Sequence, residues 1–264
     1  MYEFDYQKAA SLDDAAKFLA AHDDAKLVAG GMTLIPTLKQ RLAKPSDLVD
    51  LASIGSLKGI ADEAGGVTIG AMTRHVEVQR SDIVRRVIPA LAALAGMIGD
   101  PAVRNRGTIG GSIANNDPAA DYPAAVVGLG ATVVTTKREI SGDSFFTGMF
   151  ETALGQDEIV TTVKFPKPQA AAYQKFKNPA SRYAIVGVFV ARTGQGVRVA
   201  VTGAGPCAFR VPEMEAALAR SFSADAIKDI AIPDDGLNSD IHASAEYRAH
   251  LVGVMARRAV AACA

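Results

Sequence analysis

The sequence predicts an α+β fold built from three consecutive units, residues 1–56, 57–168 and 169–264. Helix-like and strand-like patterns succeed one another in the first two units, and the third begins with two strand-like runs followed by helices. Two closely spaced prolines, Pro166 and Pro168, mark a linker between the second and third units. A chain of 264 residues buries roughly 75 % of its unfolded surface, which is enough for more than one core.

The composition is that of a globular protein without net charge. Hydrophobic residues make up 49 % of the chain, and 28 basic residues balance 28 acidic ones. This balance gives no support to a nucleic-acid or membrane-surface role, and zero net charge favours a partner protein because it lowers colloidal stability. The sequence shows neither a signal peptide nor an apolar stretch long enough to span a bilayer, so we expect a cytoplasmic protein.

The cysteines and histidines show no spacing typical of metal ligands or of a disulfide framework. The residues concerned are Cys207, Cys263, His22, His75, His242 and His250. We therefore expect no metal bound by this chain. His75 and His242 lie in amphipathic segments and are expected at the surface.

The first unit reads as a small α/β structure with a glycine loop between a strand and a helix. Ser11 is expected to cap a helix, because Asp13 and Asp14 follow in its first turn. A strand over 26–29 leads into a loop containing Gly30 and Gly31, and a helix is predicted over 34–42, then a strand over 48–51. Backbone N–H groups at such a loop would face an anion.

The second unit reads as a larger α+β structure. We expect strands over 66–70, 131–136 and 158–165, and helices over 74–79, 89–96 and 122–129, with Thr73 capping the first of these helices. A turn is expected at Asp100-Pro101.

A second glycine motif lies between these elements, over Arg104–Asp121. Gly110 and Gly111 allow close backbone approach, and Thr108 and Ser112 on either side bring short hydroxyl donors. Asp121 could accept hydrogen bonds from ligand hydroxyls. The motif therefore has the features needed to hold a phosphorylated, sugar-like chain.

The third unit begins with a predicted antiparallel hairpin. Runs at 184–191 and 197–202 are joined by 192–196, and helices are expected at about 211–220, 223–230 and 245–262.

Each glycine loop alone could equally be a plain turn between a strand and a helix. Two such loops in adjacent units favour one dinucleotide held between them. A GxGxxA match at 203–208 is rejected as a Rossmann site, because its strand belongs to a hairpin and Pro206 removes an N–H group. The chain has no P-loop and no evident catalytic triad, so we expect no catalytic side chain.

Four further residues are candidates for contacts with a ligand. Arg104 and Arg106 precede the second motif, either as anion clamps or as part of a solvated turn or an intersubunit ion pair. Lys177 could stabilise an anionic ring and Tyr183 could stack on its face, although from its spacing alone a tyrosine at the start of a strand is usually a core residue.

The two motifs together resemble the FAD-binding medium subunits of the molybdenum hydroxylases (the xanthine dehydrogenase family), aerobic carbon monoxide dehydrogenase in particular. The family pattern Ala-Gly-Gly-x-Ser/Thr-Leu-x-Pro is matched over 29–36, and Arg-Asn-x-Gly-Thr-x-Gly-Gly-x-x-Ala over 104–114, followed by Asp-Pro-x-x-Asp over 117–121. Residues 69–73 and 244–248 also match. Ser112 stands where relatives often carry asparagine, so one pyrophosphate or ribityl contact is expected to be weaker or water-mediated.

This resemblance implies a two-subdomain FAD-binding (PCMH-type) fold, followed by a C-terminal domain of a small antiparallel sheet with helices. FAD is the implied cofactor. The implied cofactor contacts of the two motifs are Ala29, Gly30, Gly31, Met32, Thr33, Leu34, Thr108, Ile109, Gly110, Gly111 and Ser112, and all of these except Ala29 are implied to hold the pyrophosphate. The other implied contacts are Asp121 on the ribityl or ribose hydroxyls, Ile159 and Val160 at the adenine or flavin edge, Lys177 at the pyrimidine end, and Tyr183 on one ring face.

The resemblance also implies a function, that of the FAD-carrying electron-transfer subunit of a heterotrimeric molybdenum hydroxylase. Electrons would come from the [2Fe-2S] clusters of a small subunit, and a large subunit would carry the molybdenum cofactor, in a dimer of heterotrimers. The external acceptor would be a quinone, NAD or oxygen. A stand-alone FAD-dependent oxidoreductase and a non-redox nucleotide-binding module are the alternatives.

Overall fold

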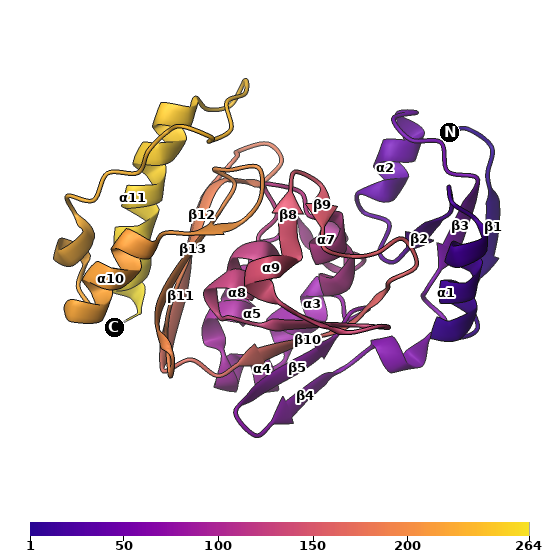
Figure 1. Ribbon diagram of the computed structural model, residues 1–264, viewed down its shortest axis with the longest axis horizontal. Coiled ribbons are helices and arrows are strands. Elements are labelled where there is room, and N and C mark those ends of the chain that lie inside the picture. Colours follow the sequence, from indigo (N-terminus) through magenta and orange to yellow (C-terminus); the bar gives the residue numbers. More distant parts are fainter. Residues whose placement is uncertain (264) are drawn as a thin grey trace.

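The computed structural model describes residues 1–263 and confirms an α+β fold. Three groups of helices and strands follow one another along the chain (Figure 1). The N-terminal elements lie at one end of the molecule and the C-terminal helices at the other, with the second unit between them. No helix among the described residues is both long and apolar enough to cross a membrane.

The first unit holds a three-stranded parallel sheet in the order β1-β3-β2. Its elements are β1 (Asp5–Lys8), α1 (Leu12–Ala21), β2 (Lys26–Val28), α2 (Leu34–Lys39), β3 (Asp47–Asp50) and the 3-10 turn η1 (Gly55–Leu57). Ser11 caps α1 as predicted, because its hydroxyl accepts the N–H of Asp14 at 3.1 Å. The helix predicted over 34–42 ends earlier, at Lys39, and Arg41 then adopts a left-handed φ of 61°.

The second unit is a five-stranded antiparallel sheet in the order β4-β5-β10-β6-β7. Its strands are β4 (Ile60–Glu63), β5 (Gly66–Gly70), β6 (Thr132–Thr135), β7 (Glu139–Ser141) and β10 (Val160–Pro166), with a small ribbon of β8 (Phe146–Gly148) and β9 (Glu151–Thr152). Its helices are α3 (His75–Arg80), α4 (Asp82–Val87), α5 (Pro89–Gly96), α6 (Pro101–Arg104), α7 (Ile109–Asn115), α8 (Tyr122–Gly128) and α9 (Gly142–Phe145).

One helix start in this unit differs from the prediction. Arg74, not Thr73, precedes α3, and the Glu77 carboxylate accepts the Arg74 N–H at 2.8 Å. The Thr73 hydroxyl instead donates to the Gly59 carbonyl oxygen at 3.0 Å. A hydroxyl that could cap the helix is thus used to tie the chain after β5 to the residue before β4.

The third unit is a four-stranded antiparallel sheet in the order β11-β12-β13-β14, covered by helices. Its elements are β11 (Ala170–Lys177), β12 (Ala184–Thr193), β13 (Gly196–Thr202), β14 (Phe209–Arg210), α10 (Pro212–Arg220), the 3-10 turn η2 (Ala224–Ile227) and α11 (Ala245–Ala262). The hairpin is confirmed, and its strands run further into the turn than predicted. The helix expected over 223–230 is only the short η2, and β11 was not predicted.

The sheet of the third unit is buried on both faces. Tyr173 and Phe189 belong to the core of the second unit, whereas Val188 and Val190 face the helices α10 and α11 in a separate core. This alternation follows the two-residue period of a strand. The second and third units are therefore joined through a common hydrophobic core.

Candidate cofactor site

The two glycine motifs touch each other. A Cβ atom added to Gly30 would collide with the Arg106 carbonyl oxygen and lie 2.7 Å from the Gly107 Cα, and one added to Gly111 would lie 3.4 Å from the Ala29 Cβ. Only glycine permits backbones to approach this closely. The fold thus brings together two motifs that lie in different units of the chain.

The first motif offers unpaired backbone donors. Gly31 has a φ of +70°, which lets the loop turn sharply before α2. No hydrogen bond among the described residues uses the N–H groups of Gly30, Gly31, Met32, Thr33 and Leu34. The loop is half-buried at most, so these N–H groups can reach a ligand. A run of free amides is suited to phosphate oxygens, and a pyrophosphate fits this loop chemically.

The second motif contributes differently, because its amides are already paired. The Gly110 N–H donates to the Ala71 carbonyl oxygen at 2.8 Å, and the Gly111 N–H to the Thr108 hydroxyl at 3.2 Å. Thr108 is buried and caps α7, which begins at Ile109. Of the two hydroxyls singled out in the sequence, only that of half-buried Ser112 makes no hydrogen bond within the described chain. The glycines of this motif therefore let its backbone come close to a ligand, and Ser112 offers one hydroxyl. The motif does not offer a run of free N–H groups.

Asp121 lies deep in the structure, with 4 % of its surface exposed. The Tyr173 hydroxyl donates to one carboxylate oxygen at 2.5 Å, and the Lys175 ammonium contacts the other at 2.9 Å. Burial raises the pKa of the Asp121 carboxyl, and both partners oppose that rise. Because each oxygen already accepts a hydrogen bond from the protein, a ligand hydroxyl could use only the remaining lone pairs.

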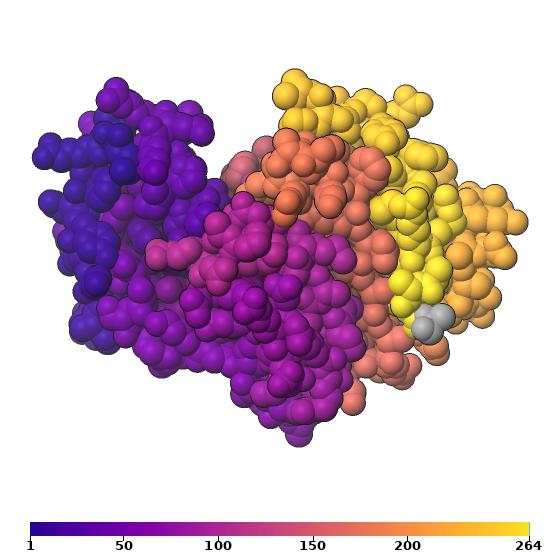
Figure 2. Space-filling model, turned by 180° about the vertical axis from the view of Figure 1, so that it is seen from behind, coloured from indigo at the N-terminus to yellow at the C-terminus, as the bar shows by residue number. Residues whose placement is uncertain are grey.

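Tyr183 brings the third unit to the first motif. It precedes β12 and is 42 % exposed, so it is not the core residue that its spacing alone would allow. Burial and the nearby Asp117 raise the pKa of its phenol, while the Thr33 side chain, in the first motif, lowers it. Figure 2 shows the surface notched between the indigo N-terminal part and the orange and yellow C-terminal part. Tyr183 therefore lies beside Thr33, where the third unit meets the glycine loop of the first, and we call this junction of units the crevice.

The other implied contacts have different settings. Ile159 and Val160 are buried in two different cores, at the start of β10. Lys177 is exposed at the end of β11 and forms no ion pair within the described chain. Arg104 is half-buried and donates to the Ile98 carbonyl oxygen at 2.9 Å, which favours its structural role over an anion clamp.

His75 is a functional neighbour that sequence reasoning placed wrongly. It is buried, with 4 % exposed, and its ring lies against Gly107 of the second motif. Burial, helped by the Arg104 charge, lowers the pKa of the imidazole to about 4, so the ring is neutral at pH 7. His75 lies three residues before Val78, so the two side chains share one face of α3, and this apolar face was the available signal that His75 points inward.

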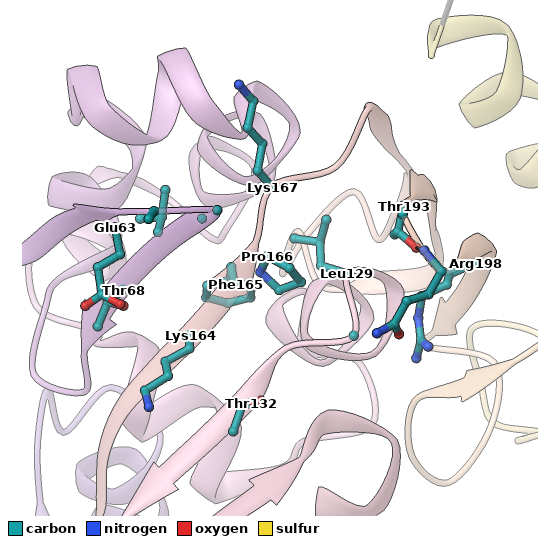
Figure 3. A pocket seen from close by; sticks show the side chains of 17 residues that line it. Glu63, Thr68, Leu129, Thr132, Lys164, Phe165, Pro166, Lys167, Thr193 and Arg198 are labelled. Carbon is teal, nitrogen blue, oxygen red and sulfur yellow. Dashed lines mark hydrogen bonds between the residues drawn. The ribbon is translucent and has the colours of Figure 1, made fainter.

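Two hollows are not lined by the glycines of either motif. One of about 400 Å³ is bordered by Asp117, Phe150, Tyr183 and Arg248, next to the crevice. The other, of about 470 Å³, lies between β10 and the β12–β13 turn, with Lys164 and Arg198 among its walls (Figure 3). No residue of either motif borders the second hollow, and Lys164 there pairs with Glu139. It is not the site that the motifs indicate.

Comparison with known proteins identifies the family. The family described as "FAD binding domain in molybdopterin dehydrogenase" matches residues 2–168, and "CO dehydrogenase flavoprotein C-terminal domain" matches residues 171–263. The nicotine 6-hydroxylase medium subunit of Paenarthrobacter nicotinovorans is 35 % identical, over 97 % of this chain and 95 % of its own length. The carbon monoxide dehydrogenase medium chain of Hydrogenophaga pseudoflava is 34 % identical, over 97 % and 96 %.

Solved structures have the same fold. A carbon monoxide dehydrogenase from Hydrogenophaga pseudoflava superposes with a TM-score of 0.91 at 35 % identity, covering 99 % of this chain and 97 % of its own. Quinoline 2-oxidoreductase from Pseudomonas putida 86 superposes with a TM-score of 0.90 at 30 % identity, covering 99 % and 97 %. We conclude that the chain belongs to the FAD-binding family of the molybdopterin dehydrogenases, that its cofactor is FAD, and that it serves an oxidoreductase.

Proposed function

We propose that this chain is the FAD-carrying electron-transfer subunit of a heterotrimeric molybdenum hydroxylase, with FAD held in the crevice at the two glycine motifs. The observation that carries this is the run of free N–H groups over Gly30–Leu34, packed directly against the second motif. FAD supplies the redox chemistry when bound, and the protein supplies binding and orientation.

The proposed contacts divide between three parts of the chain. The N–H groups of the first motif bind the pyrophosphate, and the Ser112 hydroxyl adds one contact from the second motif. Tyr183 covers one face of the ring, because its phenol already lies beside Thr33. Lys177 is exposed, and its proposed contact is with the pyrimidine end.

We propose further that the chain receives electrons from the [2Fe-2S] clusters of a small subunit and passes them to an external acceptor. The substrate would be oxidised in a large subunit that carries the molybdenum cofactor. Support comes from relatives whose names are medium subunit or medium chain, among them those of nicotine 6-hydroxylase and glyceraldehyde dehydrogenase. The dimer of heterotrimers and the cytoplasmic location expected from the sequence stay predictions.

The experiment for the cofactor site is a titration of Gly111→Val with FAD. A side chain at Gly111 would point into the narrow space between Thr108 and Ala29, whereas one at Gly110 would hit the Ala71 main chain and test folding instead. We expect the variant to lose the visible flavin band after reconstitution and gel filtration. Gly194→Val, at an exposed turn with open space around it, is the matched control and should bind normally. Unchanged FAD affinity in Gly111→Val would exclude the crevice as the site.

A further inference from the structure

The last part of the second motif, residues 118–121, is held by the sheet of the third unit. The Gly203 N–H donates to the Pro118 carbonyl oxygen at 2.8 Å, and the Thr202 hydroxyl donates to that of Ala120 at 2.6 Å. The Ala184 N–H reaches the Ala119 carbonyl oxygen at 3.3 Å. Three consecutive carbonyl groups between α7 and α8 thus accept hydrogen bonds from β12, β13 and the residue after β13.

The segment ends at Asp121, whose side chain is held by a third strand of the same sheet. Tyr173 and Lys175 both lie on β11, which packs against α5 (Figure 1). The Lys175 side chain is only 2 % exposed, and its ammonium also contacts the Met97 carbonyl oxygen, at 3.2 Å, just beyond α5. A lysine is rarely buried to this degree unless it is paired.

Removing Lys175 from the Lys175–Asp121 ion pair would change the state of Asp121. Removing the ammonium leaves a buried carboxylate whose remaining donor among the described side chains is the Tyr173 hydroxyl. Such a group must either take up a proton or move toward water. Movement of Asp121 would displace the segment that runs back to Asp117, which borders the cavity next to Tyr183. That segment also forms the end of the second motif.

We propose that Lys175 is a positioning residue for the FAD site, acting from the third unit through Asp121 on the wall formed by 117–121. This inference rests on the proposed placement of FAD in the crevice. Lys175 itself need not touch the cofactor. FAD affinity then depends on correct docking of the C-terminal sheet, through one buried ion pair.

The test is FAD binding by the full chain carrying Lys175→Met, a side chain of similar length without charge. We expect FAD to bind about ten- to hundredfold more weakly, by analogy with the loss seen when residues that orient metal ligands are removed. Lys175→Arg keeps the cation and should recover part of the lost affinity. Melting temperatures without FAD are measured in parallel, and titrations are run where every apo variant is folded.

Arg198→Met is the matched control. Arg198 also reaches from the third unit to the second, with its Nε donating to the Val127 carbonyl oxygen at 2.9 Å and its guanidinium paired with Asp143, away from Asp121. It should lower the melting temperature without changing FAD affinity. If affinity follows melting temperature in both variants, Lys175 has only a structural role and the proposal fails.

The remaining outcomes separate this proposal from the proposed site. Wild-type affinity in Lys175→Met, with weak binding in Gly111→Val, overturns the role of Lys175 alone. Wild-type affinity in both variants overturns the crevice as the FAD site. Should Lys175→Met fail to fold, Tyr173→Phe removes a single hydrogen bond to Asp121. It is expected to weaken FAD binding severalfold, and unchanged binding there also refutes the proposal.

Discussion

At the scale of single residues, the ligand that the site can bind depends on which polar groups have no hydrogen-bond partner within the protein. The N–H groups over Gly30–Leu34 are free, whereas those of Gly110 and Gly111 are paired within the protein. The residue types alone made the two motifs look equivalent. The difference arises because Thr108 caps a helix and Ala71 comes close enough to accept a hydrogen bond, and both contacts depend on the folded chain.

His75 makes a prediction about pH at this scale. Its pKa is lowered to about 4 in the folded state by burial, so the unfolded chain takes up the proton first as the pH falls. Stability from the neutral ring is fully present above about pH 6.5 and is lost as the pH falls toward the folded value, by about 2 kcal/mol at pH 5. Denaturant unfolding at pH 7 and pH 5 measures this loss.

The variant His75→Gln should remove most of that difference between the two pH values, whatever its own stability. His242→Gln is the control, because His242 is exposed and its replacement should leave the pH dependence as in the wild type. Equal pH dependence in His75→Gln and wild type would mean that the buried ring does not control this part of the profile.

Glu158 makes a second prediction, for a group whose charged form is the one that the fold favours. The Arg138 guanidinium, 3.0 Å away, lowers the pKa of its carboxyl to about 2, although burial opposes the shift. A depressed carboxyl pKa contributes stability above the unfolded value of about 4.3, and this contribution is lost as the pH falls toward 2. Glu158→Gln should cost about 1–3 kcal/mol at pH 7, since Arg138 is partly exposed, and nothing near pH 2. Urea unfolding across this range would show a constant difference if the ion pair were unimportant.

At the scale of elements, capping and periodicity predicted most of the helices and strands. The helix α11 was predicted over its whole length, and Ser11 and Pro89 begin helices as expected. The strand β11 was not predicted, because its three consecutive alanines favour a helix and only pairing with β12 makes them extended. Missing this strand also hid Tyr173 and Lys175, which the alternation of β11 turns toward Asp121.

The start of α7 provides a prediction for a single element. Thr108→Val keeps the shape of the side chain and removes the hydroxyl that accepts the Gly111 N–H. Loss of this cap should lower the free energy of unfolding by about 1 kcal/mol, whereas Thr108→Ser should keep most of it. Chemical denaturation of the two variants tests this, and equal stability would show that the cap does not stabilise α7.

At the scale of the whole molecule, the site exists only because three units meet. The first motif, the second motif and Tyr183 come from different units, and the sheet of the third unit contributes Tyr173 and Phe189 to the core of the second. Sequence patterns identified the motifs and the units separately. They could not show that Gly30 packs on Gly107, because that contact depends on how the units dock.

A truncation tests this dependence. A fragment of residues 1–168 would expose the face that normally packs on Tyr173 and Phe189. We expect it to bind hydrophobic dyes, to melt without cooperativity and to bind FAD poorly. A cooperative melt with full FAD affinity would show that the third unit is dispensable for the site.

The most direct test of the central claim is a crystal structure of the full chain grown with FAD. The pyrophosphate is expected within hydrogen-bond distance of the N–H groups of Gly30–Leu34, between the two glycine motifs, with the ring against Tyr183. Density for FAD in the hollow beside Lys164 and Arg198, or anywhere that leaves those N–H groups without a ligand, would contradict the account.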